Sequence, residues 1–432
     1  MSTAMIGALG FVSMFLMMFM GLPVALAMLL VGVLGMGLIL TGDAAMHLLS
    51  SAVWEQLSAY SLTVIPLFVL MGQVAYRSGV TERIYQSAYT WFGRTPGGIA
   101  STTVLASMGF SCISGSNSAT AATMGAMAIP EMRKYKYNDT LSTGSVAIGG
   151  TLGAIIPPSV VLIVIAVQTE QSIIKLFLGS LIPGLMLTAL LVATIFFICF
   201  RNRDLGPAGP AFTLKEKLVG LKGIVEPIAI FTVVMSGLFL GIFTPTEAGA
   251  AGAFCMVLVA VVRKQIAING LIQCIAETLR ISSMVLLLLA AAVIFGKFLA
   301  VTRIPFELAE WVADLPVSSV LILLVILAVY TLGGMLMDSL GFLVATLPIF
   351  FPLASSLGFD PIWFTVMLTL VTSLGAVTPP VGVNVFIVSS FVPEVPVQRI
   401  FKGVGVFILA YIVCLGLIAA FPSTVLMLPG IM

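Results

Sequence analysis

Two short motifs that break apolar helices are the residues of this sequence best suited to chemistry. The segment 153–159 (GAIIPPS) returns as 375–381 (GAVTPPV), at an offset of 375 − 153 = 222. Paired prolines remove backbone donors and stop a helix. Inside a membrane the carbonyls set free must be buried in protein or line a polar cavity. Such carbonyls, with hydroxyls beside them, are good ligands for a hard cation such as Na⁺. The alternative interpretation is a pair of structural proline kinks.

Polar residues precede both breaks at matching distances, since Ser116 and Asp338 also differ by 222 positions. Helix N-termini that begin after the breaks would point positive dipoles at the same centre, which suits an anionic substrate. Asp338 lies in an apolar stretch, where a charge is costly, so it is predicted to serve a coupling ion or to pair with Lys297 or Arg303. These two basic residues are compatible with attraction of an anion, and equally with snorkelling to the interface. The residues expected to offer oxygens to a cation are Ser114, Ser116, Asn117, Ser118, Gly334, Asp338, Gly375 and Thr378.

The composition places these motifs in a membrane. Of 432 residues, 60% are hydrophobic and 8% are charged, against about 25% charged in a soluble domain. Apolar runs such as 6–40, 176–200 and 403–421 are each long enough to span a bilayer as a helix. The sequence therefore predicts a polytopic α-helical membrane protein. It contains no P-loop, HExxH motif or catalytic Ser/His/Asp set that would indicate an enzyme, and no basic block that would indicate nucleic-acid binding.

Equivalent loops of the two repeats carry opposite charge bias. The loop 131–139 holds three basic residues and its counterpart 353–360 holds none, whereas the bare loop 41–43 corresponds to Arg263-Lys264. Lys and Arg favour the cytoplasmic side, so the halves are predicted to cross the membrane in opposite directions, as inverted repeats do. The basic linker 201–222 should be cytoplasmic, and both chain termini should be periplasmic.

Each repeat is predicted to contain the same elements in the same order. Two helices split at Pro23 or Pro245 come first, then an interfacial stretch, then a helix, a re-entrant hairpin and a broken helix. The interfacial stretches are 44–61 and 266–283, and the helices that follow them are 62–78 and 285–302. The predicted fold class is an all-α polytopic membrane protein with two inverted-topology repeats, re-entrant helical hairpins and broken helices.

Five segments, taken in order, resemble the large membrane subunit (DctM type) of tripartite ATP-independent periplasmic (TRAP) transporters over essentially the whole chain. They are 114–132 (SGSNSATAATMGAMAIPEM), 149–159 (GGTLGAIIPPS), 241–254 (GIFTPTEAGAAGAF), 334–352 (GMLMDSLGFLVATLPIFFP) and 373–386 (SLGAVTPPVGVNVF). The resemblance implies the ion-transporter superfamily and an elevator mechanism, in which a transport domain slides against a scaffold.

The resemblance also implies uptake of a small organic anion across a bacterial inner membrane. Na⁺ would be the coupling ion, with no other cofactor. A periplasmic binding protein would deliver the substrate. A small membrane subunit (DctQ type) would be a separate chain, because no such segment precedes Met1. The rival hypotheses are a stand-alone Na⁺-coupled anion symporter of similar fold, a passive channel and a membrane enzyme. The sequence does not say whether the anion is a dicarboxylate, a sugar acid, a keto acid or a sulfonate.

Read in that way, the resemblance divides the chain into scaffold and transport parts. These are 1–61, scaffold helices and arm of repeat 1; 62–175, first half of the transport domain, with hairpin 97–130 and broken helix 140–170; 176–223, joining helix and cytoplasmic linker; 224–284, scaffold helices and arm of repeat 2; 285–402, second half of the transport domain, with hairpin 317–352 and broken helix 362–392; and 403–432, the C-terminal helix.

It also assigns site residues. The Na⁺ ligands would come from Ser114, Ser116, Asn117, Gly153, Pro157, Gly334, Asp338, Gly375, Thr378 and Val381. The substrate would meet Ser116, Asn117, Pro158, Ser159, Pro379, Asn384, Lys297 and Arg303. Ile156 stands opposite Thr378 in the repeat, so the two cation sites need not be equivalent.

Overall fold

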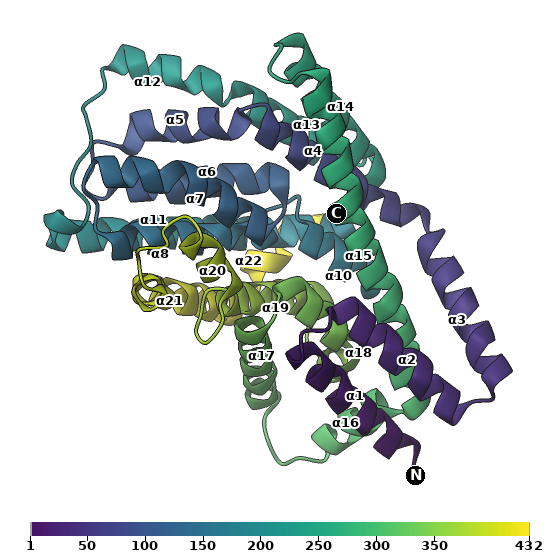
Figure 1. Ribbon diagram of the computed structural model, residues 1–432. Coiled ribbons are helices and arrows are strands. Elements are labelled where there is room, and N and C mark those ends of the chain that lie inside the picture. Colours follow the sequence, from purple (N-terminus) through teal and green to yellow (C-terminus); the bar gives the residue numbers. More distant parts are fainter. Residues whose placement is uncertain (1, 432) are drawn as a thin grey trace.

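The computed structural model describes residues 2–431, and within that range the regular structure is helical (Figure 1). The first repeat contains α1 (Thr3–Phe19), α2 (Val24–Ile39), α3 (Gly42–Leu57), η1 (Tyr60–Thr63), α4 (Val64–Arg77), α5 (Val80–Phe92), α6 (Gly98–Ser114), α7 (Asn117–Lys134), α8 (Asp139–Gly150), α9 (Leu152–Ile155) and α10 (Val160–Gln168). The joining segment contains α11 (Ile173–Arg201), η2 (Arg203–Leu205), α12 (Leu214–Gly220) and η3 (Leu221–Gly223).

The second repeat follows the same order. It contains α13 (Val225–Phe239), α14 (Pro245–Val262), α15 (Ile268–Thr302), α16 (Ile304–Ala313), α17 (Ser319–Leu336), α18 (Ser339–Ser356), α19 (Pro361–Gly375) and α20 (Val383–Ser389). The chain ends with α21 (Val397–Ala420), α22 (Ser423–Leu426) and η4 (Pro429–Ile431). In the part of the chain that the structure describes, seven helices are long and apolar enough to span a membrane, or up to nine if each bent pair counts as one span. The polytopic helical fold is as predicted.

Both re-entrant hairpins form where the sequence places them. α6 ends at Ser114 and is followed by Gly115, whose φ of +58° is in the left-handed region that favours glycine. α7 begins at Asn117 and is capped by Ser116, whose hydroxyl accepts the Ala119 N–H. The second tip differs, because the Asp338 carboxylate caps α18 by accepting from the N–H groups of Leu340 and Gly341 at 3.1 and 3.2 Å. A polar cap therefore starts the descending helix of each hairpin.

Both predicted helix breaks are also present. The chain leaves helical geometry between Ile155 and Val160 in the first repeat, and between Gly375 and Val383 in the second. The Pro157–Pro158 and Pro379–Pro380 peptide bonds are both cis, so the two breaks share their backbone form.

One expected pair of elements is wrong. The interfacial stretch 266–283 and the helix 285–302 are not separate, because α15 runs through both without interruption. In the first repeat, α3 and α4 are bent by 51° at a short break. Pro66 lies in the first turn of α4, where proline fits, but it would cost a hydrogen bond inside a continuous helix. α15 contains no proline, so this helix continues.

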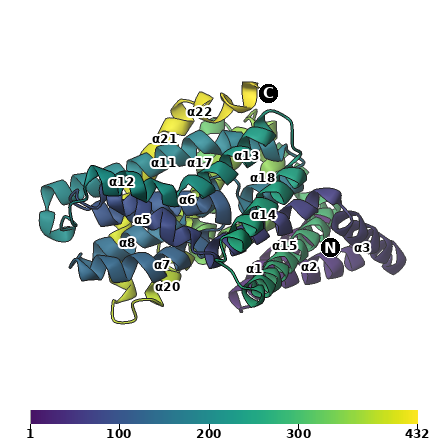
Figure 2. The same cartoon turned by 90° about the horizontal axis from the view of Figure 1, so that it is seen from above.

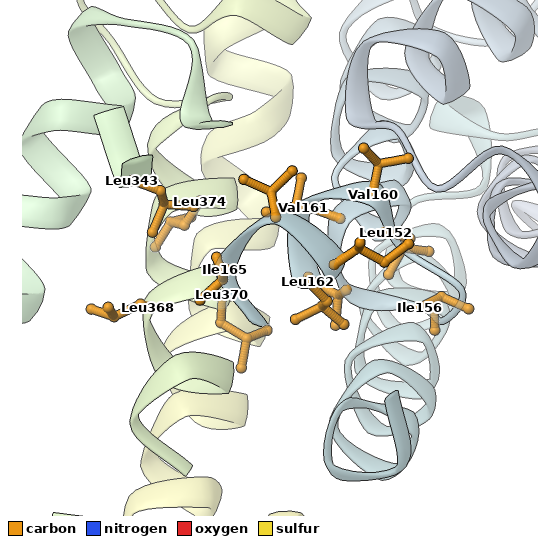
Figure 3. Close-up of a cluster of buried hydrophobic side chains, with 14 of the residues drawn as sticks. Leu152, Ile156, Val160, Val161, Leu162, Ile165, Leu343, Leu368, Leu370 and Leu374 are labelled. Atoms are coloured by element: carbon orange, nitrogen blue, oxygen red, sulfur yellow. The ribbon is translucent and has the colours of Figure 1, made fainter. Parts of the chain in front are cut away.

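The two repeats are interleaved around the breaks. α10 of the first repeat packs against α18 and α19 of the second, and α20 of the second packs against α7 and α8 of the first. In Figure 3, Val161 and Ile165 of α10 lie towards Leu343 of α18 and Leu374 of α19. α1, α2, α3 and α15 gather on one side of the molecule, away from α6, α7 and α8 (Figure 2). Each break is thus packed partly by the other repeat.

Ion pairs between loops agree with an inverted arrangement. Arg133, in the last turn of α7, pairs with Glu394, which follows α20. Glu226, at the start of α13, pairs with both Arg83 and Arg263. These loops all come from segments that the charge bias places on one side of the membrane. The contacts therefore put those segments together; which side faces the cytoplasm stays a prediction.

Candidate functional site

A cavity of about 470 Å³ lies where the two hairpin tips, the two breaks and the helices α4 and α15 meet. Six predicted site residues line it: Ser114, Ser116, Asn117, Ser118, Asp338 and Asn384. They come from both repeats and from positions up to 270 residues apart in the chain (384 − 114). The structure therefore brings the polar tips together at one place, as the repeat predicted.

On the first repeat's side, the hairpin tip lies directly on the break. A Cβ atom at Gly153 would lie 2.3 Å from the Ser116 carbonyl oxygen, closer than real contacts allow. Asn117 ties the same tip to both repeats. Its Oδ1 accepts the Ala154 N–H at 2.7 Å, and its Nδ2 donates to Ser373 Oγ at 3.4 Å. Only glycine permits this approach, and the buried amide holds it.

The rest of the first break lies behind the cavity wall. Pro157, Pro158 and Ser159 are buried and do not line the cavity. Ser159 donates to the Ala154 carbonyl at 2.7 Å, and the Val160 N–H donates to the Gly115 carbonyl at 3.2 Å. These bonds join the break to the hairpin tip, so in this conformation these residues support the site without facing it.

The second break meets its own hairpin in a similar way. A Cβ atom at Gly375 would lie 2.5 Å from the Thr331 carbonyl oxygen and 2.7 Å from the Gly334 carbonyl carbon. The N–H groups of Val381 and Gly382 both donate to the Met335 carbonyl at 3.2 Å. Here, too, a glycine pair allows a break to lie against a hairpin.

The second break nevertheless has a different environment. Pro379 and Val381 are exposed, and neither lines the cavity. Thr378 is half-buried, and its hydroxyl donates to the Leu374 carbonyl at 2.6 Å, leaving its lone pairs available. Asn384 is buried and reaches across to the first repeat, where its Nδ2 lies 3.5 Å from the Ala147 carbonyl oxygen.

The charged residues are not gathered as a set. Asp338 lines the cavity, and within residues 2–431 it makes no ion pair with Lys297 or Arg303. Lys297 lies twelve residues beyond Val285, the last α15 residue in the cavity wall, which is about 18 Å along the helix. Arg303 is exposed at the end of α15, with its guanidinium 5.3 Å from the Phe306 ring centroid. The structure does not place these two cations in the cavity wall.

Sequence reasoning missed one wall of the cavity. α4 contributes Val69, Gly72, Gln73 and Tyr76, and α15 contributes only apolar side chains. The signal available was Gln73, a lone amide within an otherwise apolar run, next to Gly72, which has a counterpart in Gly296 of the second repeat at an offset of 224. The wall is therefore polar on the α4 side and apolar on the α15 side.

Re-entrant hairpins, paired broken helices and a cavity between two interleaved repeats define the class: an all-helical polytopic membrane protein of the secondary-transporter type. The profile described as "Tripartite ATP-independent periplasmic transporter, DctM component" matches residues 11–424. The chain belongs to this family of large permease subunits, which are transporters and not enzymes.

Similar proteins give the same family. The chain is 33% identical to the C4-dicarboxylate TRAP transporter large permease protein DctM of Pseudomonas aeruginosa, over 88% of this chain and 89% of that protein. It is 31% identical to the sialic acid TRAP transporter large permease protein SiaM of Vibrio cholerae, over 96% of each. It is 29% identical to the isethionate TRAP transporter permease protein DctMQ of Oleidesulfovibrio alaskensis, over 91% of this chain and 61% of that protein.

The fold has a counterpart among solved structures. The YdaH transporter of Alcanivorax borkumensis superposes with a TM-score of 0.67 at 14% identity, over 93% of this chain and 98% of that one. At this identity the likeness concerns the fold alone. It confirms the predicted class of helical membrane protein with broken helices.

Proposed function

We propose that this chain is the permease subunit of a Na⁺-coupled, binding-protein-dependent importer of a small organic anion. The observation that carries the proposal is the cavity of about 470 Å³, which joins both polar hairpin tips to the two breaks. Its position between the repeats is where secondary transporters hold substrate and coupling ion. Alternating access would then expose this cavity to each side of the membrane in turn.

Na⁺ coupling is supported by the oxygen atoms that the folded chain gathers beside the cavity. Ser114, Ser116 and the Asp338 carboxylate reach it directly. The Thr378 hydroxyl and the carbonyls around Gly375 lie at the adjoining break. A hard cation prefers several such oxygens at once. We assign Ser114, Ser116, Asn117, Gly153 and Pro157 to the first site and Gly334, Asp338, Gly375, Thr378 and Val381 to the second.

A small anion is supported by the donors in the cavity wall. The wall contains the N-terminus of α7 and the side-chain amides of Asn117 and Asn384. Its lining residues include no Lys or Arg. Backbone N–H groups at a helix start bind anions without a formal positive charge. Three relatives are named for C4-dicarboxylate, sialic acid and isethionate. Each of these named compounds carries an anionic carboxylate or sulfonate group. Pro158, Ser159 and Pro379 would support this site from behind.

An elevator motion is supported by the contact between α4 and the first hairpin. A Cβ atom at Gly72 would lie 3.1 Å from the Ile113 carbonyl oxygen and from Ser114 Cα, so the glycine leaves a smooth surface beside the tip. α4 and α15 pack against the predicted scaffold helices α14 and α2, respectively. We therefore assign α4 and residues 285–302 of α15 to the scaffold, although they were expected in the transport domain. The hairpin would slide along this surface, carrying the cavity with it.

The partners follow from the family and its fused members. The DctMQ relative carries both subunit letters in its name, and this chain aligns with 61% of it. This supports a small DctQ-type membrane subunit as a partner, together with a periplasmic substrate-binding protein. The protein would act in a bacterial inner membrane with both chain ends in the periplasm.

Uptake in proteoliposomes tests this function. The chain and its small subunit would be reconstituted, and labelled carboxylates and sulfonates offered with and without an inward Na⁺ gradient and the binding protein. We expect uptake that requires both. Uptake that needs Na⁺ but no binding protein would support the stand-alone symporter. Flux independent of the gradient would overturn coupled transport.

A further inference from the structure

A second hollow of the molecule lies apart from the proposed transport cavity. It is a groove of about 780 Å³ between α5, α6 and α11 on one wall and α13 on the other. Its lining is almost entirely apolar. One face of α5 supplies Ile84, Ala88 and Trp91, and one face of α13 supplies Ile224, Ile228 and Phe231. Residues at this helical spacing form continuous stripes, so two apolar stripes face each other across the groove.

The groove is open to its surroundings. Ile228 is 54% exposed and Leu185 is 48% exposed, although both belong to its wall. α13 packs mainly against α14 and makes only a few contacts with α6 across the groove. In a bilayer such a space is filled, because an empty gap forfeits the dispersion contacts of every atom that lines it. The Ser87 hydroxyl in the lining already donates to the Gly220 carbonyl, and few other polar groups remain that would hold ordered water.

One end of the groove carries a basic, aromatic rim. The Trp91 indole N–H donates to the Lys217 carbonyl at 3.2 Å, and Lys217 Nζ lies 5.7 Å from the Trp91 ring centroid. Lys217 belongs to α12, which packs along α5 (Figure 1). Exposed Leu214 and Leu218 on the same helix would rest on the membrane. Trp and Lys side chains at this level are where lipid headgroups are bound.

We propose that this groove binds a membrane phospholipid, with an acyl chain between α5 and α13 and the phosphate beside Lys217. A helix of a partner subunit fits the space poorly. A spanning helix is about 10–12 Å wide and about 30 Å long, so its volume is roughly 2,400–3,400 Å³. This is several times the volume of the groove, which is about 780 Å³. An acyl chain is thin and flexible, and each buried methylene favours binding.

The lipid would touch the machinery of the first repeat. Ile156, within the first break, lines the groove, and a Cβ atom at Gly184 would lie 2.4 Å from its Cδ1. Met108 and Cys112 of α6 line it as well. The acyl chain thus completes the packing behind the first break, where the transport cavity lies on the other side.

Lipid retention tests the proposal directly. The complex with its small subunit would be washed in detergent and exposed to phosphatidylglycerol, and bound lipids counted by native mass spectrometry. Ala88→Trp fills the groove from α5 and Thr232→Trp fills it from α13, so one variant remains informative if the other fails to fold. We expect each to retain one phospholipid fewer than the wild type. Leu409→Trp, on the exposed face of α21, is the matched control and should retain the same number, because Leu409 lines neither this groove nor the transport cavity.

The rim has its own test. Lys217→Glu should weaken phosphatidylglycerol binding by about fivefold or more, since one basic residue near a phosphate is worth roughly that factor. Equal retention by the wild type and both filled variants would overturn the proposal. A lipid that is retained by the permease chain alone but absent from its complex with the small subunit would overturn the proposal too, because it would mean that a protein covers the groove. Neither outcome depends on which substrate or ion is transported.

Discussion

The break of the first repeat is buried, while the same motif in the second repeat lies at the surface. Ser159 is fully buried, but its counterpart Val381 is 36% exposed. Ser116 at the first tip is half-buried, whereas its counterpart Asp338 at the second is exposed. Both breaks keep the glycine contact and the cis proline pair. The same motif in unequal surroundings indicates that the two halves of the site need not have the same role.

The buried half is clamped by polar side chains, and the open half is not. Asn117 connects the first break to α19 of the second repeat, while Ser339 at the equivalent position bonds only to the Thr372 carbonyl at 3.3 Å. We therefore expect the first half of the site to be rigid and the second half to be the one that can change its conformation. The following predictions test this contrast, beginning with the largest expected effect.

The glycines under the two tips should be equally intolerant of a side chain. Gly153→Ala and Gly375→Ala each place a methyl group within 2.5 Å of backbone atoms, and such overpacking costs about 3 kcal/mol or more where the backbone must shift. We expect uptake to be lost and the melting temperature to fall in both. Gly296→Ala is the control, since its nearest neighbour is 3.6 Å away. A tolerated Gly375→Ala would show that the open half adapts.

Removing the clamp should harm the first half more than the second. Asn117→Ala leaves the Ala154 N–H without its partner in a buried place, which costs about 1–3 kcal/mol. Ser339→Ala removes a donor to a carbonyl that already accepts the Ala376 N–H, so about 1 kcal/mol or less is expected. Thermal unfolding of the two variants in the same detergent measures the difference. Equal destabilisation would remove the contrast.

Much of this arrangement was predictable from the sequence. Paired prolines, the Ser-rich tip and Asp338 placed the hairpins and breaks correctly, because helix stops and caps are local signals. The cavity wall on α4 was not predictable, since which face of an apolar helix meets the tip depends on packing between the repeats. The burial of Pro158 and the exposure of Pro379 arise in the same way. The continuity of α15 was not predicted, although the absence of proline from residues 268–302 was a local signal for it.

The negative charge of Asp338, at the second hairpin tip, should affect Na⁺ activation of uptake and not the stability of the fold. Asparagine caps a helix as well as aspartate does, so Asp338→Asn should keep the bonds to Leu340 and Gly341 and leave the melting temperature unchanged. We expect weaker Na⁺ activation of uptake, by about tenfold in the half-maximal concentration if the carboxylate contributes about 1.4 kcal/mol. Unchanged Na⁺ activation would exclude Asp338 from the coupling site.

The hydroxyl of Thr378 and the methyl groups of Ile156 occupy equivalent positions and should act differently. Thr378→Val is expected to raise the Na⁺ concentration for half-maximal uptake several-fold, about fivefold for a lost ligand worth about 1 kcal/mol. Ile156→Thr should leave Na⁺ activation unchanged and lower stability by about 1–2 kcal/mol, because a hydroxyl replaces buried carbon beside Gly184. An identical Na⁺ curve for Thr378→Val would mean that its hydroxyl is not a ligand.

The smallest expected effect concerns the loops rather than the site. Arg133 pairs with Glu394, while its counterpart Ser355 bonds only within its own helix. A hydrogen bond from the Glu394 backbone N–H and one from Arg133 lower the pKa of the Glu394 carboxyl. A lowered carboxyl pKa stabilises the folded state above the unfolded value, and this is lost as the pH falls through the folded value. Arg133→Ser should therefore lower the melting temperature slightly at pH 7 and not at acidic pH, and Glu394→Gln should do the same. A decrease of equal size at both pH values would mean that Arg133 acts through packing, and the pairing of these loops would then lose its electrostatic basis.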